Sequence, residues 1–257
     1  MGQDVDYSAR LYAGYTEGRA LGESAIEIWR SAFSRNASSE RPLTVLDLGC
    51  GTGRFTPVLA DLFGGPVVGV EPAQRMLSIA ETKNQHPEAS YVLGDAENIP
   101  LDDNSCDLAL LFLMFHHVPN RDAAAQELAR VLRPGGRVLL VSSFGDRLEE
   151  RLWFQFFPRA RQIEERMFPS FDEVTGLFAD SGFNYIGLDR VECEVASSFR
   201  AYADKISHRA IPTFEYLEED EIETGFSLLH DAASKDAGQV PVRESADVLV
   251  FELRAIS

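Results

Sequence analysis

The sequence predicts an α/β fold, with a seven-stranded, mostly parallel sheet, helices on both faces and a small helical cap insertion. Two observations favour this class. Short apolar runs alternate with stretches of helical periodicity through the first half of the chain, and strands that alternate with helices are typical of a parallel sheet. Two later strand-like runs, at residues 183–195 and 247–253, flank a long insertion that we expect to form two helices.

The first strand is predicted at residues 43–48, a short apolar run with β-branched members. Glycines follow at once at positions 49, 51 and 53. Apolar side chains at positions 55, 58, 59 and 62 then recur with the spacing of one helix face. The segment therefore predicts a strand, a tight glycine turn and a helix. Such a turn lets the backbone approach a ligand where any Cβ atom would collide.

Four further strands are predicted at residues 67–70, 89–93, 106–115 and 137–141. The run at 106–115 is almost continuously apolar, which is typical of a central strand in a parallel sheet. In open α/β sheets, ligands bind outside the carboxyl ends of the strands. Polar and charged residues at the ends of the predicted strands are therefore candidate ligand-binding residues.

Composition excludes several classes of partner. The 257 residues include 24 basic and 41 acidic side chains, a net charge of −17, which argues against a nucleic-acid substrate and against docking on anionic membranes. The three cysteines form no C-x-x-C pair, so we expect neither a disulfide framework nor a metal site. No apolar leader or bilayer-length run is visible, so we expect a cytoplasmic protein; the oligomeric state is not predicted.

The spacing of the glycines distinguishes between cofactors. A dinucleotide fingerprint is G-x-G-x-x-G. Here the turn is G-x-G-x-G, preceded by Asp47, and no lysine follows as in a phosphate-binding P-loop. An acidic side chain beside the turn repels a pyrophosphate and favours a cationic group such as an amine. The structural alternative is a glycine turn that merely closes a strand–helix unit.

The run Asp47-Leu48-Gly49-Cys50-Gly51-Thr52-Gly53 resembles the first motif of class I S-adenosylmethionine-dependent methyltransferases. The -His-His-Val-Pro- run at 116–119 resembles the small-molecule branch typical of ubiquinone and menaquinone biosynthesis, and the run at 132–137 resembles a late motif of the class. The resemblance implies a Rossmann-like fold and S-adenosyl-L-methionine as cofactor, with S-adenosyl-L-homocysteine as product. It implies an enzyme that transfers a methyl group to O, N or C of a small molecule.

The resemblance also implies roles for particular residues. Glu71, at the end of the second strand, is placed to accept hydrogen bonds from ribose hydroxyls, although it could instead offset the dipole of the next helix. Asp95 would take the exocyclic amine of adenine, and the Ala96 amide would meet a ring nitrogen. The expected cofactor-binding residues are Tyr7, Tyr15, Arg19, Asp47, Gly49, Cys50, Gly51, Gly53, Glu71, Pro72, Met76, Asp95, Ala96, Glu97, Phe112 and Leu113.

The chain departs from this branch at Leu111-Phe112, where a small polar pair is usual. The departure makes the methyl-transfer end of the site more apolar. The same strand end lacks the Asn/Asp-Pro-Pro-Tyr motif of amino-group DNA methyltransferases and the acidic residue of the metal-dependent catechol type.

His116 and His117 are the candidate catalytic residues, because histidine titrates near neutral pH and both follow a central strand. A base is needed only if the acceptor must lose a proton, and the alternative is that one or both histidines are structural. Two other functions stay open at this point. One is a nicotinamide-dependent oxidoreductase, which the glycine spacing disfavours, and the other is an S-adenosylmethionine-binding protein without methyl transfer.

We expect residues 1–40 to form an N-terminal helical lid, in which Tyr7, Tyr15 and Arg19 match a segment that folds over the cofactor in the class, with Arg19 on the methionine carboxylate. Residues 41–257 would form the catalytic domain. Helical cap insertions are expected at about 145–169 and 197–240, the first because of its aromatic stretch around Trp153. Core packing is the alternative interpretation of those aromatic side chains.

Overall fold

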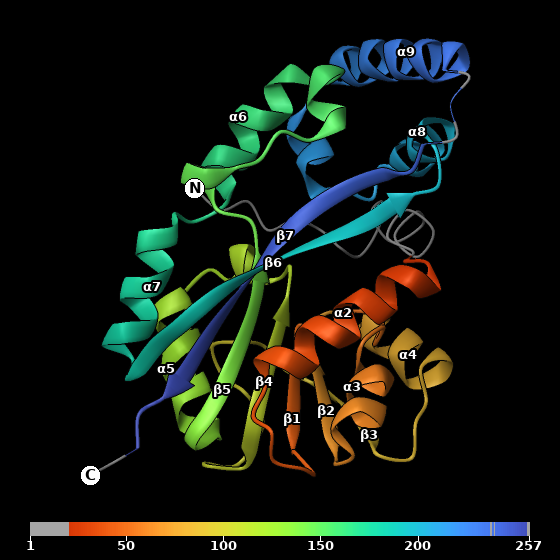
Figure 1. The fold of residues 1–257 in the computed structure, drawn as a ribbon. Helices are drawn as coiled ribbons and strands as arrows, with labels where there is room; N and C mark the ends of the chain where they lie inside the picture. The colour runs from red at the N-terminus through yellow and green to blue at the C-terminus, as the bar shows by residue number, and fades with distance from the viewer. Residues whose placement is uncertain (1–20, 237, 239, 256–257) are drawn as a thin grey trace. The chain divides into compact units, whose positions relative to one another are not determined.

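A computed structural model describes residues 21–236, 238 and 240–255 of the chain (Figure 1). Within these residues, seven strands form one sheet in the order β3-β2-β1-β4-β5-β7-β6. Strands β1 to β5 pair in parallel, and β7 runs antiparallel to β5. The prediction of an α/β fold with a seven-stranded, mostly parallel sheet is therefore confirmed.

The strands are β1 (Val45–Leu48), β2 (Val67–Glu71), β3 (Ala89–Leu93), β4 (Cys106–Phe112), β5 (Leu132–Ser142), β6 (Phe183–Ala196) and β7 (Val242–Leu253). The α-helices of the described residues are α2 (Glu23–Asn36), α3 (Thr56–Phe63), α4 (Gln74–Lys83), α5 (Arg121–Val131), α6 (Pro158–Met167), α7 (Phe171–Asp180), α8 (Phe199–Ser207) and α9 (Glu219–Lys235). Short 3-10 turns are η1 (Phe115–His117), η2 (Gly145–Arg147), η3 (Leu152–Gln155) and η4 (Pro212–Tyr216).

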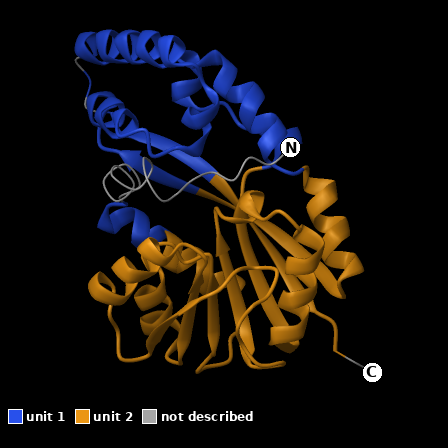
Figure 2. Ribbon diagram, turned by 180° about the vertical axis from the view of Figure 1, so that it is seen from behind, with its two compact units in different colours: residues 1–28, 144–169, 192–245 blue, residues 29–143, 170–191, 246–257 orange. Residues whose placement is uncertain are grey.

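The chain divides into two compact units, coloured separately in Figure 2. The described part of the first, which we call the sheet unit, comprises residues 29–143, 170–191 and 246–255. The described part of the second, the helical unit, comprises residues 21–28, 144–169 and 192–245. The helical unit contains the segments where helical insertions were expected; its role as a substrate cap stays a prediction, as does the lid at residues 1–40.

Strand β1 lies inside the sheet unit, paired on one side with β2 and on the other with β4. All four of its residues are buried, and three of them are apolar, with Asp47 the exception. The carboxyl ends of β1, β2 and β4 consequently lie side by side. The glycine turn follows β1, Glu71 is the last residue of β2, and the histidine turn begins shortly after β4.

Strand β4 is shorter than the sequence predicts, because it ends at Phe112 and not at residue 115. Leu113 adopts a left-handed backbone with φ of 52°, and the chain then turns into η1. Phe115 is fully buried, with its ring centroid 5.7 Å from that of Phe178 on α7. An apolar sequence cannot distinguish a longer strand from a buried turn of this kind.

The helical unit has its own aromatic core. The ring centroid of Trp153 lies 5.2 Å from that of Phe214, and Phe157 lies 5.2 Å from Phe226. The sequence predicts a helix through this aromatic stretch, but the structure has only the 3-10 turn η3 there, and α6 begins at Pro158. Proline disfavours the helical conformation in the residue before it, so Pro158 sets the start of the regular helix.

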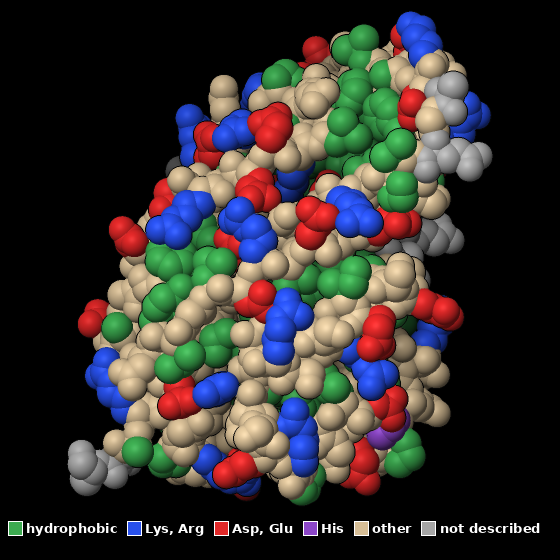
Figure 3. All heavy atoms as spheres, viewed as in Figure 1, with side chains coloured by type: hydrophobic (Ala, Val, Ile, Leu, Met, Phe, Trp, Pro, Cys, Tyr) green, Lys and Arg blue, Asp and Glu red, His purple; other side chains and the backbone are tan. Residues whose placement is uncertain are grey.

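Acidic and basic side chains are interspersed over the face drawn in Figure 3. In the sheet unit, ion pairs link Arg137 to Glu252 at 3.0 Å and Arg190 to Asp247 at 3.0 Å. Across the described part of the chain, each helix is too short or too polar to cross a bilayer.

Candidate active site

The glycine turn after β1 uses backbone conformations that favour glycine. Gly49, Gly51 and Gly53 have φ values of 66°, 59° and 76°. A Cβ atom added at Gly49 would lie 2.9 Å from Cγ of Met114, and one at Gly53 would lie 2.7 Å from the hydroxyl oxygen of Tyr91. The turn therefore tolerates no side chain at these two positions without displacement of its neighbours.

Tyr91 on β3 and Asn84, the residue after α4, brace the glycine turn through two hydrogen bonds that sequence analysis did not identify. The Tyr91 hydroxyl donates to the Asn84 carbonyl oxygen at 2.6 Å, and the Asn84 side-chain amide donates to the Thr52 carbonyl oxygen at 2.7 Å. The Tyr91 ring also fills the space beside Gly69 of β2. These residues form no recognisable motif, because an aromatic residue is common in a strand and does not reveal its hydrogen-bond partner.

Two buried carboxylates lie next to the turn. Asp47 is 2% exposed and accepts a hydrogen bond from the Thr56 hydroxyl at 2.7 Å. Glu71 is 8% exposed and accepts from the Gly51 amide at 2.9 Å and from the Ala73 amide at 3.0 Å. Glu71 thus contacts both the glycine turn and Ala73, the residue before α4. Both interpretations of Glu71, as a ribose-binding residue and as a charge that offsets the dipole of α4, therefore have a structural basis.

Burial changes the acidity of both groups. Burial raises the pKa of Asp47 to about 7, the Thr56 hydrogen bond opposes this shift, and the nearby Glu71 carboxylate adds to it. Burial also raises the pKa of Glu71, against the two backbone amides that favour its charged form. Neither carboxylate pairs with a cation among the described residues, and two adjacent buried acids of this kind favour a positively charged ligand. The ammonium and sulfonium groups of S-adenosylmethionine fit this requirement.

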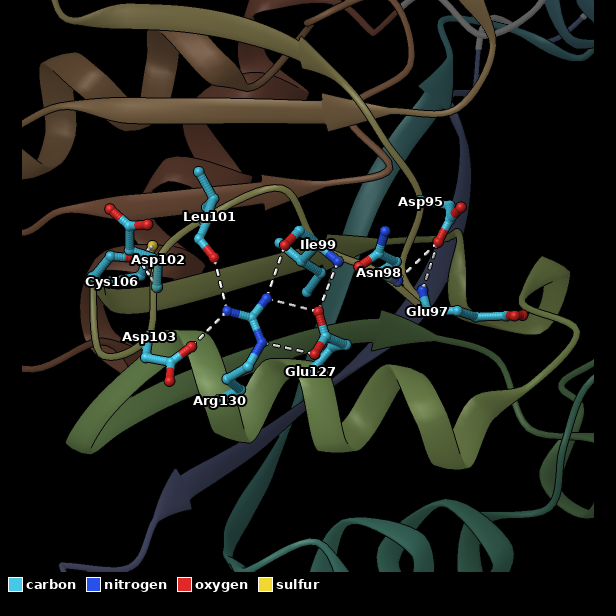
Figure 4. Close-up of polar contacts among 11 residues, drawn as sticks. Asp95, Glu97, Asn98, Ile99, Leu101, Asp102, Asp103, Cys106, Glu127 and Arg130 are labelled. Atoms are coloured by element: carbon cyan, nitrogen blue, oxygen red, sulfur yellow. Dashed lines mark hydrogen bonds and ion pairs between the residues drawn. The ribbon is translucent and has the colours of Figure 1, made fainter.

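The turn after β3 carries the residues expected to hold adenine. Asp95 is exposed, and its Oδ1 accepts hydrogen bonds from the Glu97 and Asn98 amides, each at 2.9 Å (Figure 4). Ala96 is 5% exposed. Glu97 accepts from the Asn120 amide at 2.8 Å, so its carboxylate ties this turn to the start of α5.

The end of β4 is apolar, as the sequence indicates. The Phe112 ring belongs to an aromatic cluster, with its centroid 4.5 Å from that of Phe55 and 4.8 Å from that of Trp29. Leu113 donates its amide to the Val141 carbonyl oxygen at 2.9 Å. A left-handed leucine costs conformational energy, and strain of this kind concentrates at functional sites.

The two histidines lie together in η1, with ring centroids 3.9 Å apart. Both are partly exposed. Arg121, the first residue of α5, donates to the carbonyl oxygens of Phe115 at 3.4 Å and His116 at 3.3 Å. The position of this turn is therefore fixed by the helix that follows it.

The structure places most of the sequence-predicted residues along the carboxyl ends of β1 to β4. Met76 is buried on α4, Pro72 is exposed, and Cys50 lies within the glycine turn with its thiol pKa raised by burial. Tyr7, Tyr15 and Arg19 lie outside the described residues.

A methyltransferase domain model matches residues 46–140, which span β1 to β5 and the turns described above. Demethylmenaquinone methyltransferase of Staphylococcus haemolyticus is 27% identical over 203 residues, covering 70% of this chain and 85% of that protein. The residues that the domain model matches include the glycine turn, both carboxylates and the histidine turn.

Solved structures share the fold. A candidate methyltransferase from an antibiotic biosynthesis pathway of Anabaena variabilis aligns with a TM-score of 0.71 and 19% identity, covering 90% of this chain and 99% of that chain. The [4+2]-cyclase SpnF aligns with a TM-score of 0.62 and 17% identity over 93% of this chain and 84% of that chain. With the domain match and the curated relative, these likenesses support an S-adenosylmethionine-dependent methyltransferase that acts on a small molecule, and the chain is similar to the menaquinone-biosynthesis branch.

Proposed function

We propose that S-adenosylmethionine binds along the carboxyl ends of β1 to β4, with the glycine turn beneath its methionine part. The observation that carries this proposal is the hydrogen bond from the Gly51 amide to the Glu71 carboxylate, because it joins the glycine turn to the residue expected at the ribose. Each Glu71 oxygen accepts one backbone amide and retains a lone pair for a ribose hydroxyl. Asp47 supplies negative charge for the ammonium group.

Asp95 and Ala96 would hold the adenine. One Asp95 oxygen is occupied by two backbone amides, while Oδ2 has no hydrogen-bond partner within the described residues. An exposed carboxylate oxygen of this kind is a suitable acceptor for the exocyclic amine. When bound, the cofactor supplies a methyl group already activated on a sulfonium. The protein must then align a nucleophile and exclude water, so positioning provides most of the catalysis.

We further propose that His116 or His117 removes a proton from the acceptor. Both follow the apolar end of β4, and Arg121 fixes the carbonyl groups of the turn that carries them. An imidazole titrates near neutral pH, which suits a general base. The relative named above is a demethylmenaquinone methyltransferase, so a quinone, or the quinol formed by its reduction, is the first acceptor class to test.

Methyl transfer can be tested with methyl-labelled S-adenosylmethionine, the purified protein, and a series of quinols, phenols and amines, with products identified by mass spectrometry. We expect label in a small-molecule product and stoichiometric S-adenosylhomocysteine. Binding of the donor without transfer to any member of the series or to a metabolite extract would contradict the proposal. The Gly51→Val variant is the control, because a branched side chain enters the space proposed for the methionine part.

A further inference from the structure

Helix α5 holds the loop that follows β3 through one arginine. The Arg130 guanidinium donates to the carbonyl oxygens of Ile99 and Leu101, both at 2.8 Å, and to the Asp103 carboxylate at 2.8 Å (Figure 4). It also donates to both oxygens of Glu127, one turn earlier on the same helix, at 2.7 Å each. Figure 4 shows this loop lying alongside α5, with these contacts between the loop and the helix.

These contacts use the whole guanidinium group. Arginine has five N–H donors in a fixed planar arrangement, and Arg130 makes five hydrogen bonds. The pairing with Glu127 is bidentate, the geometry in which arginine and carboxylate bind most specifically. Hydrogen bonding to Arg130 lowers the pKa of Glu127, so the pair stays charged at neutral pH. Lysine has three donors and lacks the planar arrangement, so it cannot replace Arg130.

Glu127 also contacts the loop directly, and this contact leads to Asp95. The Glu127 Oε2 accepts a hydrogen bond from the Ile99 amide at 2.8 Å. The preceding residue, Asn98, donates its amide to Asp95 Oδ1. At the other end of α5, the Asn120 amide donates to Glu97. The turn that carries Asp95 is thus fixed to both ends of one helix, although it contains no regular secondary structure of its own.

We propose that Glu127 and Arg130 are positioning residues for the adenine of the methyl donor. They fix the loop so that the exposed Asp95 carboxylate meets the exocyclic amine. The inference rests on the proposed function, in which Asp95 binds adenine. Because adenine is remote from the reacting methyl group, loss of the pair should raise KM for the donor and leave kcat at saturating donor nearly unchanged.

The test is calorimetric binding of two ligands to the full chain. One is S-adenosylhomocysteine, and the other is its deaminated analogue S-inosylhomocysteine, in which a carbonyl oxygen replaces the exocyclic amine. We expect wild type to prefer the amine-bearing ligand. In Arg130→Lys, affinity for S-adenosylhomocysteine should fall about tenfold, the equivalent of one hydrogen bond to a charged group, and the preference should be largely lost.

Two further variants complete the design. Asp95→Asn keeps an oxygen for the Glu97 and Asn98 amides but replaces the outer oxygen with an N–H donor, which suits the carbonyl of the deaminated ligand. It should therefore lose or reverse the same preference, and Arg130→Lys should add little to it. Arg133→Lys is the matched control, since Arg133 pairs at 2.6 Å with Asp107, which lies outside the loop. It should bind both ligands as wild type does.

The outcomes separate the two proposals. If wild type binds neither ligand, the proposed cofactor is wrong. If wild type and Asp95→Asn behave as expected but Arg130→Lys keeps both affinity and preference, the positioning role is wrong and the cofactor site stands. An equal loss of affinity for both ligands in Arg130→Lys, with a lower melting temperature, would show that the pair only stabilises the fold and would also overturn the inference.

Discussion

The Gly51 amide donates a hydrogen bond to Glu71 Oε2 at 2.9 Å, across 20 residues of sequence and between the ends of two neighbouring strands. The contact fixes the glycine turn and the ribose-binding candidate with respect to each other. It also orients the Glu71 carboxylate, because the second oxygen is held by the Ala73 amide. The geometry of the proposed S-adenosylmethionine site therefore depends both on where β2 ends and on the turn after β1.

Glu71→Gln should weaken binding of S-adenosylhomocysteine by roughly 1.5–3 kcal/mol, the scale of a hydrogen bond to a charged group. Glutamine is neutral and has one acceptor oxygen, whereas glutamate is charged and has two. Glutamine therefore cannot accept hydrogen bonds from both backbone amides and a ribose hydroxyl as glutamate does. Titration calorimetry measures the change. Glu81→Gln on the exposed face of α4 is the control and should bind as wild type does. Unchanged affinity in Glu71→Gln would remove the ribose assignment.

Asp47 makes stability depend on pH. Its pKa rises from the ordinary 3.8 to about 7 in the folded protein, so between these values the folded state binds more protons than the unfolded state. The free energy of unfolding should therefore fall as pH rises through this window and level off above it. Asp47→Asn keeps an acceptor for Thr56 but removes the charge, so it should be more stable than wild type at pH 8 and should bind the donor less tightly.

Urea denaturation at pH 5, 6, 7 and 8 measures this dependence, with Asp102→Asn as the control because Asp102 is exposed. The difference between Asp47→Asn and wild type should grow with pH, whereas the control should follow wild type. A constant difference would show that Asp47 does not change its charge in this window.

Two glycines with similar backbones allow a matched test of the glycine turn. Gly53 and Gly64 have φ values of 76° and 68°, but a Cβ atom at Gly53 would meet Tyr91 and Ala80 within 3 Å, whereas one at Gly64 has open space. Gly64→Ala should cost about 1 kcal/mol of stability, since only the left-handed backbone opposes it, and should keep donor affinity. Gly53→Ala should lose donor binding as well. Equal affinities in the two variants would contradict the role given to the turn.

The histidine turn can be tested by turnover. If one histidine is the base, His116→Ala or His117→Ala should lower kcat roughly 10²–10⁴-fold and leave donor affinity nearly unchanged. The pH dependence of kcat near neutrality should disappear with it. His86→Ala is the control, because His86 lies between α4 and β3 and pairs with Asp61 of α3. Loss of melting temperature and donor affinity together would indicate a structural pair, and unchanged kcat in both variants would show catalysis by alignment alone.

The sequence predicts that the glycine turn, Glu71 and Asp95 lie at strand ends, because local patterns reveal the strands of a parallel sheet, and the structure has them there. The adenine role of Asp95 comes from the family resemblance and stays a prediction. Sequence reasoning missed the contacts that hold these residues. The Tyr91–Asn84–Thr52 brace and the Arg130 contacts join residues that are distant in sequence, and no local pattern specifies such pairs. The end of β4 was placed three residues too late because the left-handed backbone of Leu113 leaves no signal in an apolar run.

The central claim, that the glycine turn and its two carboxylates bind S-adenosylmethionine, is tested most directly by thermal unfolding of the wild-type chain with ligand. S-adenosylhomocysteine at a hundredfold excess over its dissociation constant should add about 2.7 kcal/mol to the free energy of unfolding and raise the melting temperature, and NAD at the same concentration should leave it unchanged. A rise with NAD and none with S-adenosylhomocysteine would contradict the account.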